Sequence, residues 1–498
     1  MEHVHVAILG TGFGGIASAI KLQEAGYDDF VVLERASDLG GTWRDNSYPG
    51  CACDVPSHLY SFSFAPNPAW TRSFSPQPEI WDYLRSVADN AGVMKYMRFD
   101  HMVTGATWVE EQAHWLINTT QGDITANFVV AATGGLSDPK TPDIAGVETF
   151  AGKTFHSATW DHEYDLTGKR VAVIGTGASS IQFVPKIQKQ VAHLDLYQRT
   201  APWIQPRLDR QITKVEHWLF THIPVTQKIA RLGIYWSRES LVLAYTRNQR
   251  LFAPLRFTAW NHRRSQIKDP VLRRKVTPNY ALGCKRQLIS NDYYPALTKP
   301  NVDVITEGIR EVKAHSIVTS DGIEREVDAL IFGTGFHVTD FPAAQFIRGR
   351  GGVSLADAWT GGVETYLGTS VSGFPNLFFI AGPNTGLGHN SMVFMIESHV
   401  AYLVDALKTI EASGAHVVDV RRTTMDGFND KVQERMKSTV WLRGGCSSWY
   451  LDEKGRNVTL WPWATWVFRR RTARFDPAHY ELTAHPAGAE PVKQPIAV

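Results

Sequence analysis

A chain of 498 residues is too long for one hydrophobic core, so it is expected to fold as two or three domains. Its 51 lysines and arginines nearly balance 49 acidic residues, and a formal net charge of +2 does not favour nucleic acid as the main partner. The longest apolar runs, such as residues 376–381, are far shorter than the ~20 residues that span a bilayer, so no membrane partner is expected.

The cysteine pattern bears on the compartment. Cys51, Cys53, Cys284 and Cys446 form no regular framework and no repeated CxxC spacing, which predicts a reducing compartment and no metal site. The first apolar segment begins at His5, almost at the initial methionine, so no signal peptide is expected. The cytoplasm is therefore the predicted location.

The first chemical signal is a glycine-rich turn between an apolar strand and an amphipathic helix. Gly10, Gly12 and Gly15 have GxGxxG spacing, and a second apolar strand follows at 30–33. Such glycines allow the tight turn, the approach of a pyrophosphate and close packing of helix on strand. Glu34 ends the second strand, where its carboxylate can accept ribose hydroxyls. The segment predicts a site for an unphosphorylated ribose, as in FAD.

A second copy begins at KRVAVIGTGASS. Gly175 and Gly177 are in place, whereas Ser180, another small residue, stands where the third glycine would be. The position equivalent to Glu34 is held by Arg199, and a cation there favours the 2′-phosphate of NADPH. The alternative is that Arg199 is an ordinary surface arginine.

Two glycine-containing strand ends, at 129–135 and 329–336, are typical of a chain leaving and re-entering a nucleotide-binding domain. The predicted fold class is α/β, with two nested Rossmann-like dinucleotide-binding domains, for FAD and NADPH, and a helical insertion. The predicted boundaries are residues 1–145 and 330–480 for the FAD domain, 146–201 and 276–329 for the NADPH domain, 202–275 for the insertion and 485–498 for a flexible tail.

Three further motifs carry a family resemblance. FAGKTFHSATWD fits the pattern FxGxxxHxxxW followed by Asp, and its pattern residues are Phe150, Gly152, His156, Trp160 and Asp161. GGTWRDNSYPGCACD (40–54) and GCKRQLISNDYY (283–294) follow in the expected order around the two glycine turns. From His5 to about Leu482 the chain resembles the type I Baeyer-Villiger monooxygenases, which are class B flavoprotein monooxygenases.

The resemblance implies a reaction. In that family NADPH reduces FAD, O₂ adds at C4a, and the resulting C4a-peroxyflavin inserts one oxygen atom next to a ketone carbonyl to give an ester or lactone. Sulfoxidation is the implied side activity. The implied partners are a ketone and O₂, without nucleic acid or membrane, in a monomer or small homo-oligomer.

The resemblance also implies the catalytic residues. Arg286 matches the arginine that stabilises negative charge on oxygen, and an arginine suits this task because it stays charged when partly desolvated. Asp54 matches the aspartate that pairs with it. The alternatives are a surface salt bridge for Arg286 and a turn residue for Asp54. His156 and Trp160 match a linker that couples the movement of the two domains, the alternative for His156 being direct acid–base chemistry.

The remaining assignments concern the cofactors. The resemblance and the glycine turns together place around FAD residues Gly10, Gly12, Phe13, Gly15, Glu34, Gly41, Thr42, Trp43, Asp54, Tyr60, Val103 and Met392. They place around NADP residues Thr176, Gly177, Ala178, Ser179, Ser180, Gln182, Arg199, Thr200, Lys285 and Trp449. The large side chains among these also fit plain core positions. Trp449 resembles a residue of a loop that closes over NADP, but here SWY continues as LDEKG rather than as Gly-Ala-Asn. Residues 382–400 predict a glycine-rich turn opening a helix towards the flavin.

Three other classes compete with this interpretation. A disulfide reductase would need a CxxC or CxxxxC pair, and Cys51 and Cys53 are too close together. An N- or S-hydroxylating flavin monooxygenase shares the cofactors, but Trp160, Asp54 and Arg286 argue against it. A redox sensor that binds both nucleotides without turnover would not need Arg286.

Overall fold

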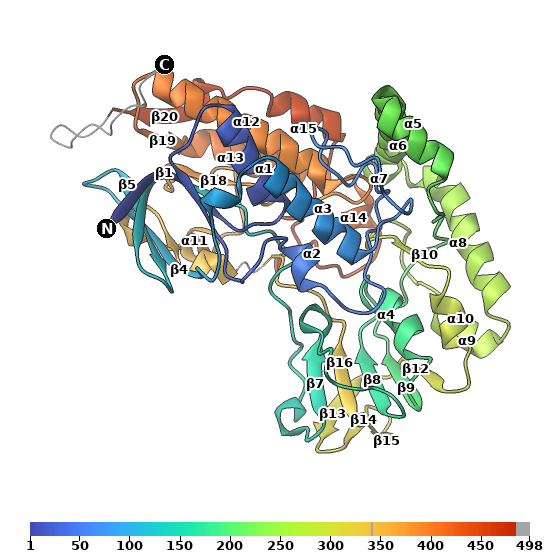
Figure 1. The fold of residues 1–498 in the computed structure, drawn as a ribbon. Helices are drawn as coiled ribbons and strands as arrows, with labels where there is room; N and C mark the ends of the chain where they lie inside the picture. The colour runs from blue at the N-terminus through green and yellow to red at the C-terminus, as the bar shows by residue number, and fades with distance from the viewer. Residues whose placement is uncertain (340–341, 485–498) are drawn as a thin grey trace.

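The computed structural model describes residues 1–339 and 342–484, so the tail predicted at 485–498 lies outside the described residues. The fold is α/β and contains two sheets with parallel cores (Figure 1). One sheet begins at the N-terminus and is completed by strands from the C-terminal third of the chain. The other is formed by the middle of the chain.

The first sheet has the order β17-β4-β5-β6-β1-β2-β3, with β18 also paired to β6. Strand β1 lies parallel to both β2 and β6, and the strands read as apolar runs because both faces of the sheet are covered. The antiparallel pairs β4–β5 and β5–β6 form a meander. The strands are β1 (Glu2–Leu9), β2 (Phe30–Leu33), β3 (Met97–Arg98), β4 (Val103–Val109), β5 (His114–Thr119), β6 (Ile124–Ala131), β17 (Ile347–Arg348) and β18 (Leu377–Phe379).

Two long helices pack beside one another on this sheet, although they are far apart in the sequence (Figure 1). Helix α1 (Phe13–Glu24) follows β1, and α12 (Met392–Ala412) comes from the C-terminal third. Most of the side chains of both helices are buried. The C-terminal segment therefore completes the core that the first glycine turn begins.

The second sheet is entirely parallel, in the order β12-β9-β8-β16-β7. A small antiparallel sheet, β13-β14-β15, contributes apolar residues to the same core cluster. These strands are β7 (Lys153–His156), β8 (Arg170–Ile174), β9 (His193–Tyr197), β12 (Val302–Ile305), β13 (Ile309–Lys313), β14 (Ser316–Thr319), β15 (Glu324–Glu326) and β16 (Ala329–Phe332). Helices α4 (Ser180–Ile187) and α10 (Tyr293–Leu297) pack against each other.

Between β9 and β12 the chain forms a run of helices along one edge of the molecule (Figure 1). They are α5 (Lys214–His222), α6 (Pro224–Glu239), α7 (Val242–Thr246), α8 (Ala253–Gln266) and α9 (Pro270–Lys275). The chain leaves through β10 (Ile204–Gln205) and returns through β11 (Leu288–Ile289), and these two strands pair in parallel.

The remaining α-helices and the last pair of strands belong to the N-terminal and C-terminal parts of the chain. They are α2 (Thr42–Asp45), α3 (Gln77–Asn90), α11 (Leu355–Ala358), α13 (Arg422–Met436), α14 (Val440–Arg443), α15 (Thr465–Arg471) and the antiparallel pair β19 (Val417–Val420) and β20 (Tyr480–Thr483). Among the described residues, no helix has both the length and the apolar character that a bilayer crossing requires.

Candidate active site

A bidentate ion pair joins Asp54 and Arg286, which are 232 positions apart in the sequence. The Arg286 Nε donates to Asp54 Oδ2 and its Nη2 donates to Oδ1, both at 2.6 Å. Its Nη1 also reaches the Leu387 carbonyl at 3.4 Å. The two side chains are 33% and 23% exposed. The pair therefore lies partly sheltered, and Arg286 keeps an open edge.

Asp54 and Arg286 each shift the pKa of the other towards the charged form. Burial tends to raise the pKa of the Asp54 carboxyl, but the Arg286 guanidinium outweighs it and holds that pKa below its usual value. Asp54 in turn raises the pKa of Arg286 despite the effect of burial. Asp54 is therefore ionised and Arg286 is a permanent cation at any working pH.

Further polar residues gather here that the sequence did not single out. Arg238, at the end of α6, is a second cation facing Asp54, and burial lowers its pKa. The Gln287 side-chain nitrogen donates at 2.9 Å to the Tyr245 hydroxyl, which donates at 3.0 Å to the Gly388 carbonyl. Burial raises the pKa of Tyr450 to about 12. Its hydroxyl makes no hydrogen bond within residues 1–339 and 342–484. The sequence predicted only a helical insertion at 202–275, so it gave no signal for Arg238.

The first glycine turn has the close contacts expected of a pyrophosphate cradle. Gly10 has φ +101°, and a Cβ there would lie 2.9 Å from the Ala132 carbonyl oxygen. A Cβ at Gly15 would lie 1.8 Å from the Gly10 carbonyl oxygen. Gly12 caps α1 without a side-chain hydrogen bond. A Cβ added at Gly41 would lie only 3.0 Å from the Gly12 Cα, so the two glycines approach each other closely. The backbone at the start of α1 is thus left open to a ligand.

Glu34 is buried where β2 ends, as predicted. Its carboxylate accepts from the Thr11 amide at 3.1 Å and the Thr11 hydroxyl at 2.5 Å, and it also pairs with Arg44 at 2.9 Å. Ribose hydroxyls bound there would share the carboxylate with these two residues. The His101 amide donates a hydrogen bond to the Glu34 carbonyl. Strand β4, which begins at Val103, therefore starts close to the end of β2.

The predicted aromatic residues of this site form one cluster. The Trp43 indole nitrogen donates to the Tyr60 hydroxyl at 3.1 Å, and the Phe13 ring packs edge-on against Tyr60 with centroids 5.2 Å apart. Thr42 begins α2 beside Trp43, and half-buried Met392 begins α12 after the glycine-rich turn that the sequence predicted. These contacts fit both a flavin pocket and a hydrophobic core.

The second glycine turn repeats the geometry of the first. Gly175 has φ +107°, and a Cβ there would lie 2.4 Å from the Gly333 carbonyl oxygen. Ser180 is fully buried, and a Cβ on Gly333 would lie only 2.0 Å from its hydroxyl. Glycine at position 333 thus makes room for Ser180, and the start of α4 packs closely on the end of β16. Gly177 and Ala178 are exposed at the start of α4, next to half-buried Ser179.

Two cations meet next to this turn. Lys285 is half-buried, and its pKa is lowered by burial and by the nearby Arg199. Arg199 is exposed, and the Thr176 hydroxyl donates to the Thr200 carbonyl at 3.3 Å. Two neighbouring cations are a suitable environment for a phosphate. Trp449 is 47% exposed and packs on Tyr450 with centroids 4.4 Å apart.

The motif at 150–161 forms the edge strand β7 and the turn after it. A Cβ at Gly152 would lie 2.4 Å from the Asp328 carbonyl oxygen, and Phe150 packs on the second core cluster. The Asp161 carboxylate pairs with Lys153 and accepts the Glu163 amide. This segment is therefore a structural edge of the second sheet.

His156 and Trp160 differ in what they touch. The His156 Nδ1 accepts the Ala158 amide at 3.1 Å, and burial lowers the pKa of His156 to about 4. A histidine that is neutral at working pH is a poor general acid. Trp160 packs on Phe183 of α4 with centroids 5.2 Å apart. Phe183 in turn packs on Tyr48 of the 40–54 motif at 6.1 Å.

Gln182 strengthens the same link. Its side-chain oxygen accepts from the Tyr48 hydroxyl at 2.9 Å, and its nitrogen donates to the Ala52 carbonyl at 2.9 Å. Ala52 lies two residues before Asp54. The side chain of Gln182, predicted to contact NADP, thus ties helix α4 to the segment that carries the ion pair.

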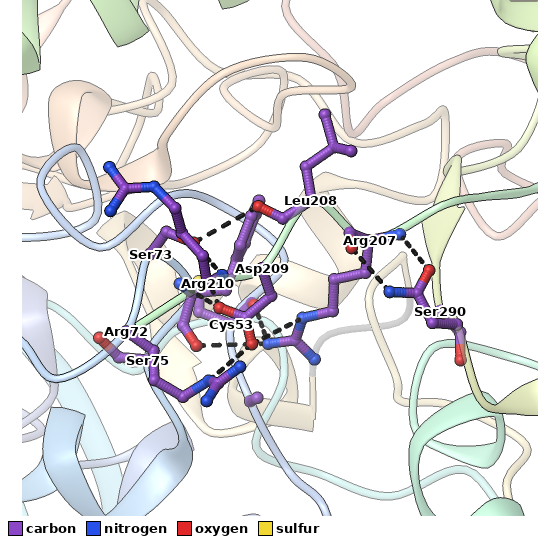
Figure 2. Close-up of polar contacts among 12 residues, drawn as sticks. Cys53, Arg72, Ser73, Ser75, Arg207, Leu208, Asp209, Arg210 and Ser290 are labelled. Atoms are coloured by element: carbon purple, nitrogen blue, oxygen red, sulfur yellow. Dashed lines mark hydrogen bonds and ion pairs between the residues drawn. The ribbon is translucent and has the colours of Figure 1, made fainter. Parts of the chain in front are cut away.

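A second set of contacts also holds the segment that precedes Asp54 (Figure 2). Asp209 accepts from the Arg72 Nε at 2.8 Å and the Ser73 hydroxyl at 3.2 Å. The Arg207 guanidinium donates to the Cys53 carbonyl at 3.5 Å and the Phe74 carbonyl at 3.3 Å. The chain entering the helices at 214–275 is thereby joined to the residue before Asp54.

A disulfide joins Cys284 to Cys446, 162 positions apart. This contradicts the expectation that the cysteines form no framework, and sequence spacing could not reveal it because the partners are so distant. The bond ties the loop carrying Trp449 and Tyr450 to the residue that precedes Lys285 and Arg286. Disulfides are typical of oxidising surroundings, so the bond gives no support to a reducing compartment.

The disulfide determines how many thiols of the protein should react. The protein denatured without reductant should show two reactive thiols, Cys51 and Cys53, and four after reduction. Native protein should react slowly, because burial raises the pKa of Cys51 to about 12. Thiol titration with and without reductant checks this, with Cys446→Ser as a control that should expose Cys284. Four reactive thiols in unreduced, denatured protein would exclude the bond.

Comparison with known proteins agrees with this geometry. Residues 3–346 match a family model that is described as flavin-binding monooxygenase-like. A Baeyer-Villiger monooxygenase of Streptomyces coelicolor is 53% identical over 98% of this chain and 94% of its own length. The closed crystal structure of cyclohexanone monooxygenase superposes with a TM-score of 0.87 and 28% identity, over 97% of this chain and all of that one. A crystal structure of OTEMO in complex with FAD and NADP gives 0.86 and 25% identity, over 96% and 99%.

The chain therefore belongs to the flavin-binding monooxygenase-like family and, within it, to the Baeyer-Villiger monooxygenases. The α/β fold with two nested Rossmann-like domains is confirmed by the superposition.

Proposed function

We propose that this protein is an NADPH-dependent flavoprotein that inserts one oxygen atom of O₂ next to the carbonyl of a ketone, giving an ester or lactone. The observation that carries the proposal is the bidentate Arg286–Asp54 pair in a chain that contains two glycine turns of the dinucleotide-binding kind. Relatives named Baeyer-Villiger monooxygenase, related over nearly the whole chain, support it.

The residues fit both cofactors. For FAD, the open start of α1, the close contacts at Gly10 and Gly15 and the buried carboxylate of Glu34 suit a pyrophosphate and an unphosphorylated ribose. For NADPH, the start of α4 and the paired cations Arg199 and Lys285 suit a phosphorylated ribose. When bound, FAD reduced by NADPH supplies the activation of O₂. The buried Tyr450 hydroxyl is a further polar atom available to a ligand near Arg286.

Arg286 performs the task that this chemistry sets for the protein. Negative charge develops on oxygen at the ketone during insertion, and a fixed cation stabilises it without reorganisation. Asp54 holds the Nε and Nη2 edge of the guanidinium, so Nη1, which reaches the Leu387 carbonyl, is the nitrogen that Asp54 does not engage. Trp160, Phe183 and Tyr48 connect the motif at 150–161 to this segment. His156, neutral by burial, acts as a structural part of that link.

The division of the chain completes the proposal. Residues 1–145 and 330–480 bind FAD, residues 146–201 and 276–329 bind NADPH, and residues 202–275 form the insertion. The ketone is a small molecule, and the enzyme works as a monomer or small homo-oligomer. A cytoplasmic location stays a prediction.

The preference for NADPH depends on Arg199. Arg199→Ala is expected to raise KM for NADPH about tenfold, because one charge-assisted contact to the 2′-phosphate is lost, and to leave KM for NADH within about twofold. Steady-state kinetics with both nucleotides measure this. Arg310→Ala, an exposed arginine on β13, is the matched control and should change neither value. Equal effects of Arg199→Ala on both nucleotides would refute the 2′-phosphate assignment.

Product analysis tests the proposed reaction. Purified enzyme with NADPH and a panel of cyclic, linear and aryl ketones should consume NADPH in a ketone-dependent manner and release esters or lactones, identified by mass spectrometry. Thioethers in the same panel test the rival N- or S-hydroxylating activity. Sulfoxides alone, with no ester from any ketone, would favour that rival.

A further inference from the structure

Helix α6 turns several polar side chains towards the protein. The Gln227 side chain donates to the Asn67 carbonyl at 2.6 Å, and the Arg231 guanidinium donates to the His58 carbonyl at 2.7 Å. Glu239 is 3% exposed and accepts from the Thr465 hydroxyl at 2.7 Å. A surface helix normally presents its apolar stripe to the core and its charges to water. In α6 the inner face carries these polar groups beside buried Tyr235 and half-buried Ile234.

A second apolar stripe of α6 faces outward. Its members recur at intervals of three and four residues, which is one face of a helix. With one neighbour from α5 they form what we call the outer apolar face: Trp218 (55% exposed), Val225 (55%), Ile229 (64%), Leu232 (55%) and Trp236 (52%). Of the 20 large apolar side chains that are exposed in the described part of the chain, 13 lie in residues 202–275. So concentrated an apolar surface marks an interaction site.

The charge of this segment is equally distinctive. Residues 202–275 contain fifteen lysines and arginines but four acidic residues, whereas the rest of the chain is acidic enough to bring the total to +2. Three of the four acidic residues are engaged: Asp209 with Arg72, Glu216 with Arg210, and Glu239 in the interior. Lys214 and Lys228, on the two helices of the outer apolar face, are exposed and form no ion pair within residues 1–339 and 342–484.

We propose that the outer apolar face docks on the surface of a lipid bilayer that carries anionic headgroups. Apolar and tryptophan side chains flanked by lysines are the composition that lies at a membrane interface, with the apolar side inserted and the cations at the headgroups. The contact is peripheral, since no helix of the described residues is able to span a bilayer. The expectation of no membrane partner rested on spanning length alone, and a surface contact does not need that length.

The positive charge of residues 202–275 and the outer apolar face together favour an anionic bilayer over two other partners, a second copy of the chain and a nucleic acid. A second copy of the chain would bring two segments with an excess of positive charge together across a symmetry axis, which is unfavourable. A nucleic acid would satisfy the lysines but leave Ile229, Leu232 and Trp236 uncovered. An anionic bilayer satisfies both the charge and the apolar surface. The inference concerns where the enzyme acts and does not depend on its proposed reaction.

Vesicle co-sedimentation of the FAD-loaded enzyme tests the proposal. Binding is expected to vesicles of phosphatidylcholine with a quarter phosphatidylglycerol, to fall with rising salt, and to be at least about tenfold weaker to phosphatidylcholine alone. Leu232→Glu and Ile229→Glu should each weaken binding to anionic vesicles about tenfold or more. Ile323→Glu, on an exposed apolar residue between β14 and β15, is the matched control and should bind as wild type.

Bound flavin absorbance and the gel-filtration mass of each variant show that it is folded. Failure to bind anionic vesicles at low salt would overturn the proposal, as would an equal loss in Ile323→Glu. A concentration-dependent dimer that Ile229→Glu abolishes would also overturn it, because the outer apolar face would then be an interface between copies.

Discussion

Arg286→Ala is expected to bind FAD and to oxidise NADPH, yet to form ester at least about 10²–10³-fold more slowly than wild type. The guanidinium is a permanent cation because Asp54 raises its pKa, and its loss removes the proposed stabilisation of charge that develops only during oxygen insertion. The first glycine turn and Glu34 do not depend on it, so the protein should remain yellow. Stopped-flow flavin spectra and product yield per NADPH separate the two effects.

A second variant and a second product test the role of Arg286 further. Arg286→Lys keeps a charge but loses the bidentate geometry, so it should recover only part of the ester yield. Oxygen that is reduced without insertion should appear as hydrogen peroxide in Arg286→Ala. Ester formation by Arg286→Ala near the wild-type rate would remove Arg286 from its proposed role.

Asp54→Ala is expected to lower ester formation about 10²-fold, because an arginine that loses its bidentate partner also loses its position. Asp54→Asn should be less damaging, since the amide oxygen still accepts one bond from Arg286. Thermal unfolding and flavin content show whether either variant is folded. Product rates under saturating NADPH provide the measurement.

The double variant decides whether Asp54 acts through Arg286. If it does, Arg286→Ala with Asp54→Ala should be no slower than Arg286→Ala alone. Fully additive losses would mean that Asp54 has a separate role. The pKa of Asp54 is held below its usual value, so the stability that the pair contributes is present above that value and is lost only as pH falls through the lowered pKa. Titration of Asp54 should therefore leave no step in the activity profile near neutral pH.

The glycine turns could be predicted because their chemistry is local. The spacing of Gly10, Gly12 and Gly15 specifies a turn, a close approach and a helix start within six residues, and the structure contains all three. The partnership of Asp54 and Arg286 could not be derived in this way. It spans 232 positions, and only the family resemblance connected the two residues before the structure did.

Other features could not be predicted because they depend on tertiary contacts. Helical periodicity, for example, does not show which face of a helix packs against the protein. The stripe through Val225, Ile229, Leu232 and Trp236 reads as a core-facing side, yet it faces outward. On the inner face of the same helix, Arg238 lies close enough to Asp54 for the two charges to interact. The disulfide between Cys284 and Cys446 depends on two distant loops meeting. The ribose site was predicted at Glu34, but the hold of Thr11 and Arg44 on that carboxylate was not.

The most direct measurement of the central claim is isotope incorporation. Enzyme, NADPH and a ketone that it converts are incubated under ¹⁸O₂, and the ester or lactone is analysed by mass spectrometry. We expect one ¹⁸O atom in the ring or ester oxygen of the product, and this labelled product should be almost completely absent with Arg286→Ala. A product without ¹⁸O, or no oxygenated ketone product despite bound flavin and NADPH consumption with every ketone tested, would contradict the central claim.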